Sequence, residues 1–387
     1  MFGRIHKINF MTTFYKEVHK PDLLKYITYS EGKVLCNLAE KSKSKRSLNY
    51  SLSLVPFYAE FETGDYLCRK ISQFNWNYGI STKGLTSADE YLKTQFNANG
   101  RKVILRNIRR LETCFNIRYE LHYGSITDHS YTLLMNRLKS MINSRFQEKK
   151  ERSKDIKEWD RIFESSKTKI RNKSASLFVI YNGEDPIEIS LNYHFGRILF
   201  SSVSSFDTDY SKFGLGNIEI YKQLEWCIDN DYEFFEMGVG GMDYKRRWSN
   251  VISPYNHFII YPNTLISKSL GVIEHTRVKF KEFLKSKKVN DFIYALIAKF
   301  NRMTIMSKRD LRYRLKKCDS GSNIKANYSS EKEIHLEDYH FLKRPVYDFL
   351  YLTQEHLSSI TILELEPERK YLLISEKNSY ELYFEYT

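Results

Sequence analysis

The amino-acid sequence predicts an α/β (α+β) protein with mixed central sheets, a basic helical extension and a small C-terminal β segment. Three observations lead to this prediction. Residues 177–261 alternate between strand-like and helical patterns in the order β-β-β-α-β-α-β. Residues 265–318 carry fifteen basic and four acidic side chains in a mainly helical pattern. Residues 357–387 alternate apolar and polar side chains, as β-strands do.

The strands and helices of residues 177–261 are bounded by clear turn signals. Residues 182–185 read Asn-Gly-Glu-Asp, a typical hairpin turn between two strands. Earlier in the chain, Ser87 and Glu90 form a capping-box pattern that begins a helix. The predicted order is strands Leu177–Tyr181, Pro186–Phe195 and Arg197–Phe206, helix Phe213–Asn230, strand Tyr232–Met237, helix Asp243–Ser249 and strand Asn256–Tyr261.

Length and charge limit the possible partners. A chain of 387 residues fits two domains plus a tail. Residues 331–387 hold twelve acidic and six basic side chains, a net charge of −6. Because the whole chain has a net charge of +14, the first 330 residues carry +20. Such a surplus favours an anionic partner, which is nucleic acid, an acidic membrane surface or a phosphorylated cofactor. A solvated basic surface is the alternative.

Cysteine, histidine and hydropathy patterns indicate the compartment and exclude some classes. The five cysteines are far apart and lack metal-ligand spacing, which favours a reduced, cytoplasmic protein. The ten histidines also lack ligand spacing, so we predict no metal site. Because no stretch approaches 18 apolar residues, we expect no membrane-spanning helix.

Two glycines, Gly214 and Gly216, lie between a predicted strand and a predicted helix. Glycine lets the backbone approach a bulky anion without a Cβ clash. The helix that begins near Asn217 directs free N–H groups and its positive dipole end toward the same place. A pyrophosphate is the natural ligand of this arrangement, and an ordinary strand-to-helix turn is the alternative.

Three stretches carry a family resemblance: residues 206–210 (Phe-Asp-Thr-Asp-Tyr), 214–216 (Gly-Leu-Gly) and 236–248, from Glu236 to Trp248. Together they resemble the signature of the CelD-like GNAT acetyltransferases, which are associated with bacterial cellulose and exopolysaccharide synthesis. That family resembles the Fem peptidyltransferases in having two GNAT-like halves. The chain departs from the family pattern at Leu215, where a proline is usual, and at Glu236-Met237-Gly238, where Asp-Phe-Gly is common.

The resemblance implies tandem GNAT-like domains. The expected divisions are an N-terminal GNAT-like lobe with a basic helix (1–172), a C-terminal GNAT lobe that binds acyl-CoA (173–264), the basic helical extension (265–318) and an acidic C-terminal helix/β segment (319–387). In this fold the strand before the glycines separates from the strand after the helix, and the pantetheine arm lies in the gap. The implied donor is acetyl-CoA or another acyl-CoA, and the expected cofactor-binding residues are Ser204, Phe206, Phe213, Gly214, Leu215, Gly216 and Asn217.

Four residues are candidates for catalysis. Tyr244, with an ordinary pKa of about 10, is a candidate general acid for the departing CoA thiolate. Lys245 could bind a phosphate or orient a carboxylate, and Glu236 or His194 could deprotonate the acceptor. Glu188 lies six residues before His194 on the same face of one strand, so the two could share a site. The structural alternatives are a packed aromatic ring, a surface lysine, a salt-bridged glutamate and a surface histidine.

Further side chains are candidates for acceptor binding. Arg106 and Arg110 fall on a basic helical face that could hold an anionic acceptor or a nucleic-acid backbone, or could be solvated. Trp248 is another candidate, with the protein core as its alternative. The predicted reaction moves an acetyl or acyl group to an amine or hydroxyl of a small molecule or surface polysaccharide precursor.

Two other functions remain open. In one, a Fem-like transferase takes its acyl group from a charged tRNA, which would use a long basic track. In the other, GNAT-fold lobes form a non-catalytic binding protein, and residues 265–318 dock on anionic lipid or nucleic acid. A peripheral anionic membrane contact is therefore among the expected partners.

Overall fold

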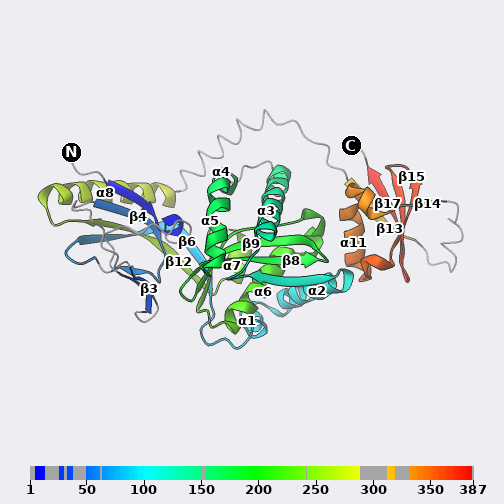
Figure 1. Ribbon diagram of the computed structural model, residues 1–387, viewed down its shortest axis with the longest axis horizontal. Helices are drawn as coiled ribbons and strands as arrows, with labels where there is room; N and C mark the ends of the chain where they lie inside the picture. Colours follow the sequence, from blue (N-terminus) through cyan, green and yellow to red (C-terminus); the bar gives the residue numbers. More distant parts are fainter. Residues whose placement is uncertain are drawn as a thin grey trace.

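One nine-stranded mixed sheet dominates the fold (Figure 1). The computed structural model describes residues 5–13, 26–29, 33–37, 49–61, 63–149, 154–240, 242–287, 312–318 and 331–385. Across the sheet, the strands are β1 (Ile5–Asn9), β4 (Asn49–Val55), β12 (Val251–Tyr261), β6 (Leu67–Ser81), β11 (Phe234–Val239), β10 (Ile198–Phe206), β9 (Asp185–Phe195), β8 (Ala175–Asn182) and β7 (Ile117–His122). A small sheet of β3 (Lys33–Asn37), β2 (Tyr26–Tyr29) and β5 (Glu60–Phe61) accompanies it.

The predicted α/β class is confirmed, and so is the element order from residue 177 to residue 261. The helices of that stretch are α6 (Leu215–Asp229) and α7 (Asp243–Trp248). The predicted strand Asn256–Tyr261 begins five residues earlier, at Val251, because the backbone on both sides of Pro254 pairs with β6. At the predicted capping box, the Ser87 hydroxyl accepts a hydrogen bond from the Glu90 amide, at 3.2 Å.

Helices cover both faces of the middle of the sheet (Figure 1). One face carries α3 (Asp128–Lys149), α4 (Lys154–Lys157) and α5 (Trp159–Arg171), and the other carries α1 (Ala88–Gln95), α2 (Ala98–Cys114) and α6. Each layer buries its own apolar core against the sheet. The sheet is therefore covered on both sides at the strands that matter for the site.

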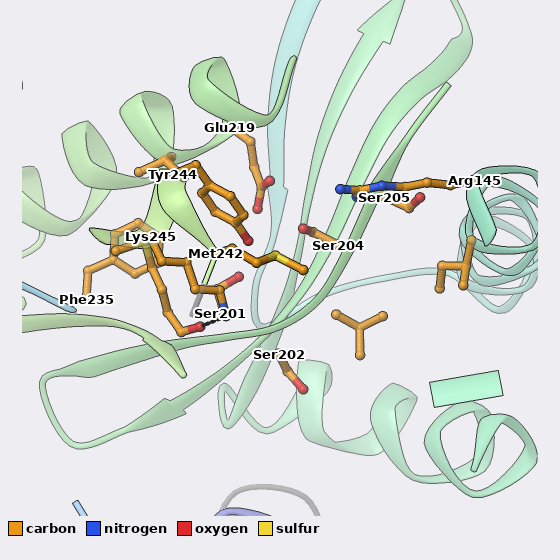
Figure 2. Close-up of a pocket in the computed structure, with 14 residues that line it drawn as sticks. Arg145, Ser201, Ser202, Ser204, Ser205, Glu219, Phe235, Met242, Tyr244 and Lys245 are labelled. Atoms are coloured by element: carbon orange, nitrogen blue, oxygen red, sulfur yellow. Dashed lines mark hydrogen bonds between the residues drawn. The ribbon is translucent and has the colours of Figure 1, made fainter. Parts of the chain in front are cut away.

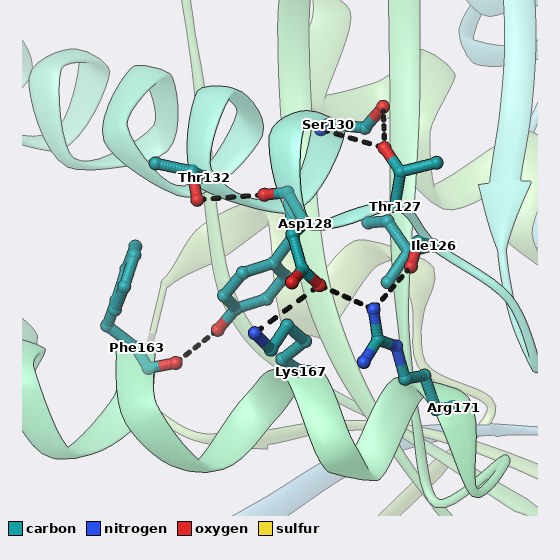
Figure 3. A network of polar contacts seen from close by, with 9 residues as sticks. Ile126, Thr127, Asp128, Ser130, Thr132, Phe163, Lys167 and Arg171 are labelled. Carbon is teal, nitrogen blue, oxygen red and sulfur yellow. Dashed lines mark hydrogen bonds and ion pairs between the residues drawn. The ribbon is translucent and has the colours of Figure 1, made fainter.

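Polar contacts hold α3 against α5 (Figure 3). The Asp128 carboxylate accepts a hydrogen bond from Arg171 at 2.5 Å and pairs with Lys167 at 3.4 Å. The Tyr131 hydroxyl donates to the Phe163 carbonyl oxygen. These contacts fix the start of α3, whose far end reaches the site described below.

The predicted boundary at residue 172 does not coincide with an edge of the sheet. Strand β7, before the boundary, pairs antiparallel with β8 after it, and β6 pairs in the same way with β11. Gly79 makes the β6–β11 approach possible, because a Cβ there would lie 2.2 Å from Cζ of Phe234. The strands of the two predicted lobes thus share one continuous sheet.

The predicted basic extension is helical in part. Helix α8 (Leu265–Ser286) lies against β4, β6 and β12. Residues 288–311 lie outside the described part of the chain. The prediction of a helix is wrong at β13 (Arg312–Lys317), which pairs with β17 (Ser379–Glu385). Its basic side chains there face acidic partners, as in the 2.8 Å contact between Arg314 and Glu385.

The C-terminal residues form the expected helix and β structure. Strands β13, β17, β16 (Lys370–Ile374), β15 (Thr361–Glu366) and β14 (Lys332–Glu333) make a separate five-stranded sheet. Helix α11 (Lys343–Thr353) joins it to the large domain, because the Tyr347 ring packs 5.0 Å from that of Phe115. The Tyr351 hydroxyl also donates to Asn107 of α2, at 2.8 Å.

Candidate active site

The sheet opens between β10 and β11. The two strands pair in parallel over only three residue pairs, from Ile198 with Phe234 to Phe200 with Glu236. Beyond them, β10 has a bulge between Ser201 and Val203, and bulges bend and twist a strand. A cavity of about 250 Å³ occupies the opening, lined by Ile142, Arg145, Ser201–Ser205, Glu219, Ile220, Phe235, Met237, Met242, Tyr244 and Lys245.

Three polar side chains from different elements meet in this cavity (Figure 2). Glu219 comes from the second turn of α6, Tyr244 from α7 and Ser204 from the separated part of β10. Figure 2 shows their carboxylate and hydroxyl groups directed toward the same space. The cavity therefore contains a potential proton acceptor beside a potential proton donor.

Burial tunes both groups for these roles. Burial raises the pKa of Glu219 to about 7, although hydrogen bonds from Ser190, Ser204 and Gln223 lower it. A carboxyl that titrates near neutral pH is suited to general-base catalysis. Burial also raises the pKa of Tyr244 to about 12, assisted by the charge of Glu219, so the phenol stays protonated.

A second buried carboxyl, Glu188 of β9, lies near Glu219. Burial and then the charge of Glu219 raise the pKa of Glu188 well above its usual range. Among the described residues, neither carboxyl oxygen of Glu188 has a hydrogen-bond partner. Glu188 is therefore neutral when Glu219 ionises, because two charges in so dry a place would repel strongly.

Lys245 lies at the edge where β11 leaves β10. Its Nζ donates to the carbonyl oxygens of Met237 at 2.6 Å and Val239 at 3.2 Å. Burial lowers the pKa of Lys245 to about 8, although Glu236 and Glu219 raise it. Lys245 thus satisfies two β11 carbonyls and places a cation at the cavity wall.

Glu236, which we predicted as a base, does not line the cavity. It is fully buried and accepts hydrogen bonds from Tyr58, from Asn77 at 2.8 Å and from Tyr255. Its neighbours on β11, Phe235 and Met237, do line the cavity, and side chains alternate between the faces of a strand. Glu236 therefore points to the other face of the sheet.

The first turn of α6 lies where the sequence predicts an anion site. Gly214 adopts φ of +69° and caps the helix, and a Cβ there would lie 2.9 Å from Nδ2 of Asn107. At Gly216 a Cβ would meet only Phe206, at 3.9 Å, so the space beside this residue is open. Arg145, which lines the cavity, lies 5.2 Å above the Phe206 ring. Phe206 and Arg145 thus connect the cavity to the helix terminus.

Three of the predicted cofactor or substrate residues belong to the core instead. The side chains of Phe213 and Leu215 are fully buried, so only their backbone groups remain for a ligand. Trp248 is 1% exposed, and its Nε1 donates to Oδ1 of Asn217 at 2.9 Å. Trp248 therefore holds the first turn of α6 in place, and Asn217 has its side-chain oxygen occupied.

His194 and Glu188 do not share a site. Both face α6, as the alternation predicts, but six extended residues separate them by ~20 Å. The His194 ring is hydrogen-bonded to Tyr232 at 2.6 Å and to Ser176 at 2.8 Å. Burial lowers its pKa to about 3. His194 is thus a neutral structural residue in an aromatic cluster.

The basic face of α2 also lies apart from the cavity lining. Arg106 is exposed, and the Arg110 guanidinium stacks 4.4 Å over the Tyr351 ring of α11. Arg110 therefore contributes to the docking of the C-terminal sheet. Among the described residues, neither arginine belongs to the cavity lining.

The sequence interpretation missed Glu219 and Arg145. A local signal existed for Glu219, which lies with Leu215 and Gln223 on the buried face of α6, at spacings of four. A carboxyl on an otherwise buried face is unusual and indicates function. Four serines within five residues of β10, at 201, 202, 204 and 205, were a second signal. Arg145 has no local signal, because only the fold brings α3 to the cavity.

Residues 98–246, which run from α2 to α7, match the acetyltransferase (GNAT) domain family. The matched stretch contains every residue that lines the cavity. No curated protein matches the chain.

Three solved structures are similar at low identity. A conserved protein of unknown function from Bacteroides thetaiotaomicron covers 55% of this chain and 70% of its own, with 9% identity and a TM-score of 0.39. The match with FemX covers 47% of this chain and 61% of FemX, with 9% identity and a TM-score of 0.35. The C-terminal domain (DUF2156) of a putative lysylphosphatidylglycerol synthetase from Agrobacterium fabrum covers 59% and 72%, with 9% identity and a TM-score of 0.36.

Two further properties concern the described ranges alone. Within them, no helix is both long and apolar enough to cross a membrane. The same ranges contain no group of three or more potential His, Cys, Asp or Glu metal ligands.

Proposed function

We propose that the protein transfers an acyl group from acyl-CoA to an amine or hydroxyl acceptor in the cavity between β10 and β11. The observation that carries this proposal is the meeting of Glu219, Tyr244 and Ser204 where the two strands separate. A GNAT-type domain over residues 98–246 supports the same reaction class.

The residues present fit an acyl-CoA donor. The first turn of α6 offers N–H groups without intrahelical acceptors, beside the open space at Gly216. The hydroxyls of Ser202 and Ser205 are buried without a partner among the described residues, so they can accept or donate a hydrogen bond to a ligand in the gap. Arg145 supplies positive charge between these two places.

The proton acceptor and the proton donor in the cavity suit acyl transfer. Glu219 takes the proton from the attacking amine or hydroxyl, which forms its bond to the acyl carbon. Tyr244 gives its proton to the departing sulfur as the thioester bond breaks, and the two side chains return to their starting states through solvent. With a pKa of about 7, Glu219 is partly ionised at neutral pH, while Tyr244 is protonated.

The chemistry of the cavity favours one class of acceptor. A base beside the donor suits a neutral nucleophile, either an amine or a hydroxyl. The resemblance of residues 206–248 to CelD-like acetyltransferases favours a saccharide or surface polysaccharide precursor, with acetyl-CoA as the donor. An anionic group on the acceptor would be attracted by Arg145 and Lys245.

The donor site is tested by a matched pair of variants, Gly216→Asp and Gly216→Asn. The two side chains have nearly the same volume and differ in charge. A carboxylate about 5 Å from the pyrophosphate costs about 2 kcal/mol at an intermediate dielectric constant, or roughly 30-fold in affinity. We expect isothermal titration with acetyl-CoA to show this loss in Gly216→Asp relative to Gly216→Asn.

Two results would count against the proposal. The wild-type protein, folded by circular dichroism, could show no binding of acetyl-CoA, or the Asp and Asn variants could bind it equally well. Tight and salt-sensitive binding of aminoacyl-tRNA, together with indifference to acetyl-CoA, would instead establish the charged-tRNA donor that we first considered.

A further inference from the structure

Helix α8 packs on the protein through its polar face. The residues that it buries against β4, β6 and β12 are Ser267, Gly271, Glu274, Val278 and Glu282. At Gly271 a Cβ would lie 2.6 Å from the Tyr261 ring, so the helix approaches the sheet closely. Val278 is the one large apolar side chain in this buried set.

Two buried carboxylates attach α8 to the sheet. Glu274 accepts a hydrogen bond from Ser51 at 2.9 Å. Glu282 accepts one from the Phe74 amide at 2.6 Å and pairs with Lys285 at 2.7 Å. These polar contacts hold the helix together with Val278, which packs against Ile71, Ile259 and Tyr261. The exposed apolar residues of the helix lie away from this contact.

The opposite face of α8 is apolar and exposed to solvent. It carries Leu265, Ile266, Val272, Ile273, Phe280 and Phe283. Leu265 is 85% exposed, Ile273 63% and Phe280 62%. The helix of 22 residues spans ~33 Å, and these side chains recur along it at spacings of three and seven, so they form one continuous stripe.

Exposed cations border this stripe. From Leu265 to Lys287 the exposed charged side chains are all basic, namely Lys268, Arg277, Lys279, Lys281 and Lys287. The two acidic residues of this range, Glu274 and Glu282, are buried. The surface that α8 presents is thus an apolar stripe within a positively charged border.

We propose that this face of α8 binds an anionic membrane surface, with the stripe among the acyl chains and the bordering cations at the headgroups. A helix with one apolar face and basic flanks is suited to lie in the plane of a membrane interface. Each exposed lysine or arginine near an anionic leaflet adds to the attraction.

The charge pattern favours a membrane over other occupants. A second copy seated face to face would bring two basic borders together, and like charges would oppose that contact. Nucleic acid would be attracted by the cations, but phosphate groups gain nothing from six exposed aliphatic and aromatic side chains. An anionic lipid surface satisfies both parts of the pattern.

Vesicle co-sedimentation of the full chain tests this inference. The vesicles are phosphatidylcholine alone or phosphatidylcholine with about 30 mol% phosphatidylglycerol. We expect the wild-type protein to bind the anionic vesicles, and the double variant Ile273→Ser/Phe280→Ser to bind them about tenfold more weakly. The matched control Leu133→Ser removes an apolar side chain, 46% exposed, from α3 and should leave binding unchanged.

A second arm tests the charge. Lys279→Gln/Lys281→Gln should weaken binding to anionic vesicles several-fold and leave the weak binding to neutral vesicles unaltered. Because every substituted side chain is exposed, all variants should melt near the wild-type temperature.

Three outcomes would overturn the inference. The wild-type protein could fail to bind anionic vesicles, or the double variant could bind as well as wild type. Sedimentation equilibrium could instead show a wild-type dimer that Ile273→Ser/Phe280→Ser converts to a monomer, which would make the stripe a contact between copies. The failure of this inference leaves the proposed acyl transfer intact, because the cavity residues are not changed.

Discussion

Replacing Glu219 with glutamine should stabilise the protein at alkaline pH while reducing acyl transfer. The wild-type carboxyl is buried, and its pKa rises from 4.5 to about 7 on folding. The folded state therefore holds the proton more tightly than the unfolded state. Stability is lost as pH rises from about 4.5, where the unfolded chain ionises, to about 7, above which the loss is constant.

The size of the effect follows from the change in pKa. Raising a pKa from 4.5 to about 7 corresponds to about 3 kcal/mol once both states are ionised. The glutamine variant carries no such cost. We expect Glu219→Gln to exceed wild type by about 1 kcal/mol at pH 5 and about 3 kcal/mol at pH 8.

Thermal unfolding from pH 5 to pH 8 measures this difference. The melting temperature of Glu219→Gln should rise above that of wild type by roughly 5 °C or more at pH 8, and by much less at pH 5. The control is Glu225→Gln, the same substitution at a partly exposed position of α6, which should raise the melting temperature at pH 8 less than Glu219→Gln does. A difference that stays constant with pH, or a variant less stable than wild type at pH 8, would refute the reasoning.

Two further substitutions test the proposed proton donor and proton acceptor in a coupled assay that follows release of free thiol. Tyr244→Phe should lower kcat about 100-fold or more and leave KM for acetyl-CoA nearly unchanged, since the phenol acts on the leaving group and not on the bound donor. A fall in kcat that is matched by an equally large rise in KM would exclude that role. Glu188→Gln should leave the acid limb of the pH–rate profile near pH 7, because Glu188 is neutral there. A limb moved well below pH 7 would show that Glu188 is charged and is itself the cause of the high pKa of Glu219.

Local patterns predict what depends on local geometry. The order of strands and helices from residue 177 to residue 261 is readable because hairpin turns, glycines and periodicity are all local. The glycine pair at 214 and 216 is predicted for the same reason, and its φ of +69° at Gly214 is a conformation that other residues rarely adopt.

Distances between elements escape such patterns. Alternation places Glu188 and His194 on one face correctly, but it does not say that each packs against a different end of α6. It also cannot choose the face of β11 that borders the cavity, and the result is that Glu236 points away from it while Phe235 and Met237 line it. Residue type alone therefore does not identify the base, because the face of the strand on which a side chain lies decides whether it reaches the cavity.

The carboxyl pair in the α6–sheet interface is the strongest sign that the cavity is functional. Glu188 and Glu219 occupy buried positions whose neighbours, such as Leu215, Ile218 and Leu224, are fully buried apolar side chains. An ionisable group in such a place opposes folding, and an amide or an aliphatic side chain of similar size would not. Glu188 has no hydrogen-bond partner among the described residues. The hydrogen bonds to Glu219 come from neutral side chains, and together with the charge of Arg145 they offset only part of the cost of burial. The same desolvation that opposes folding brings the pKa of Glu219 to about 7. A proton-transfer site at the gap between β10 and β11 requires such a pKa, and this explains why the protein keeps a carboxyl that lowers its stability.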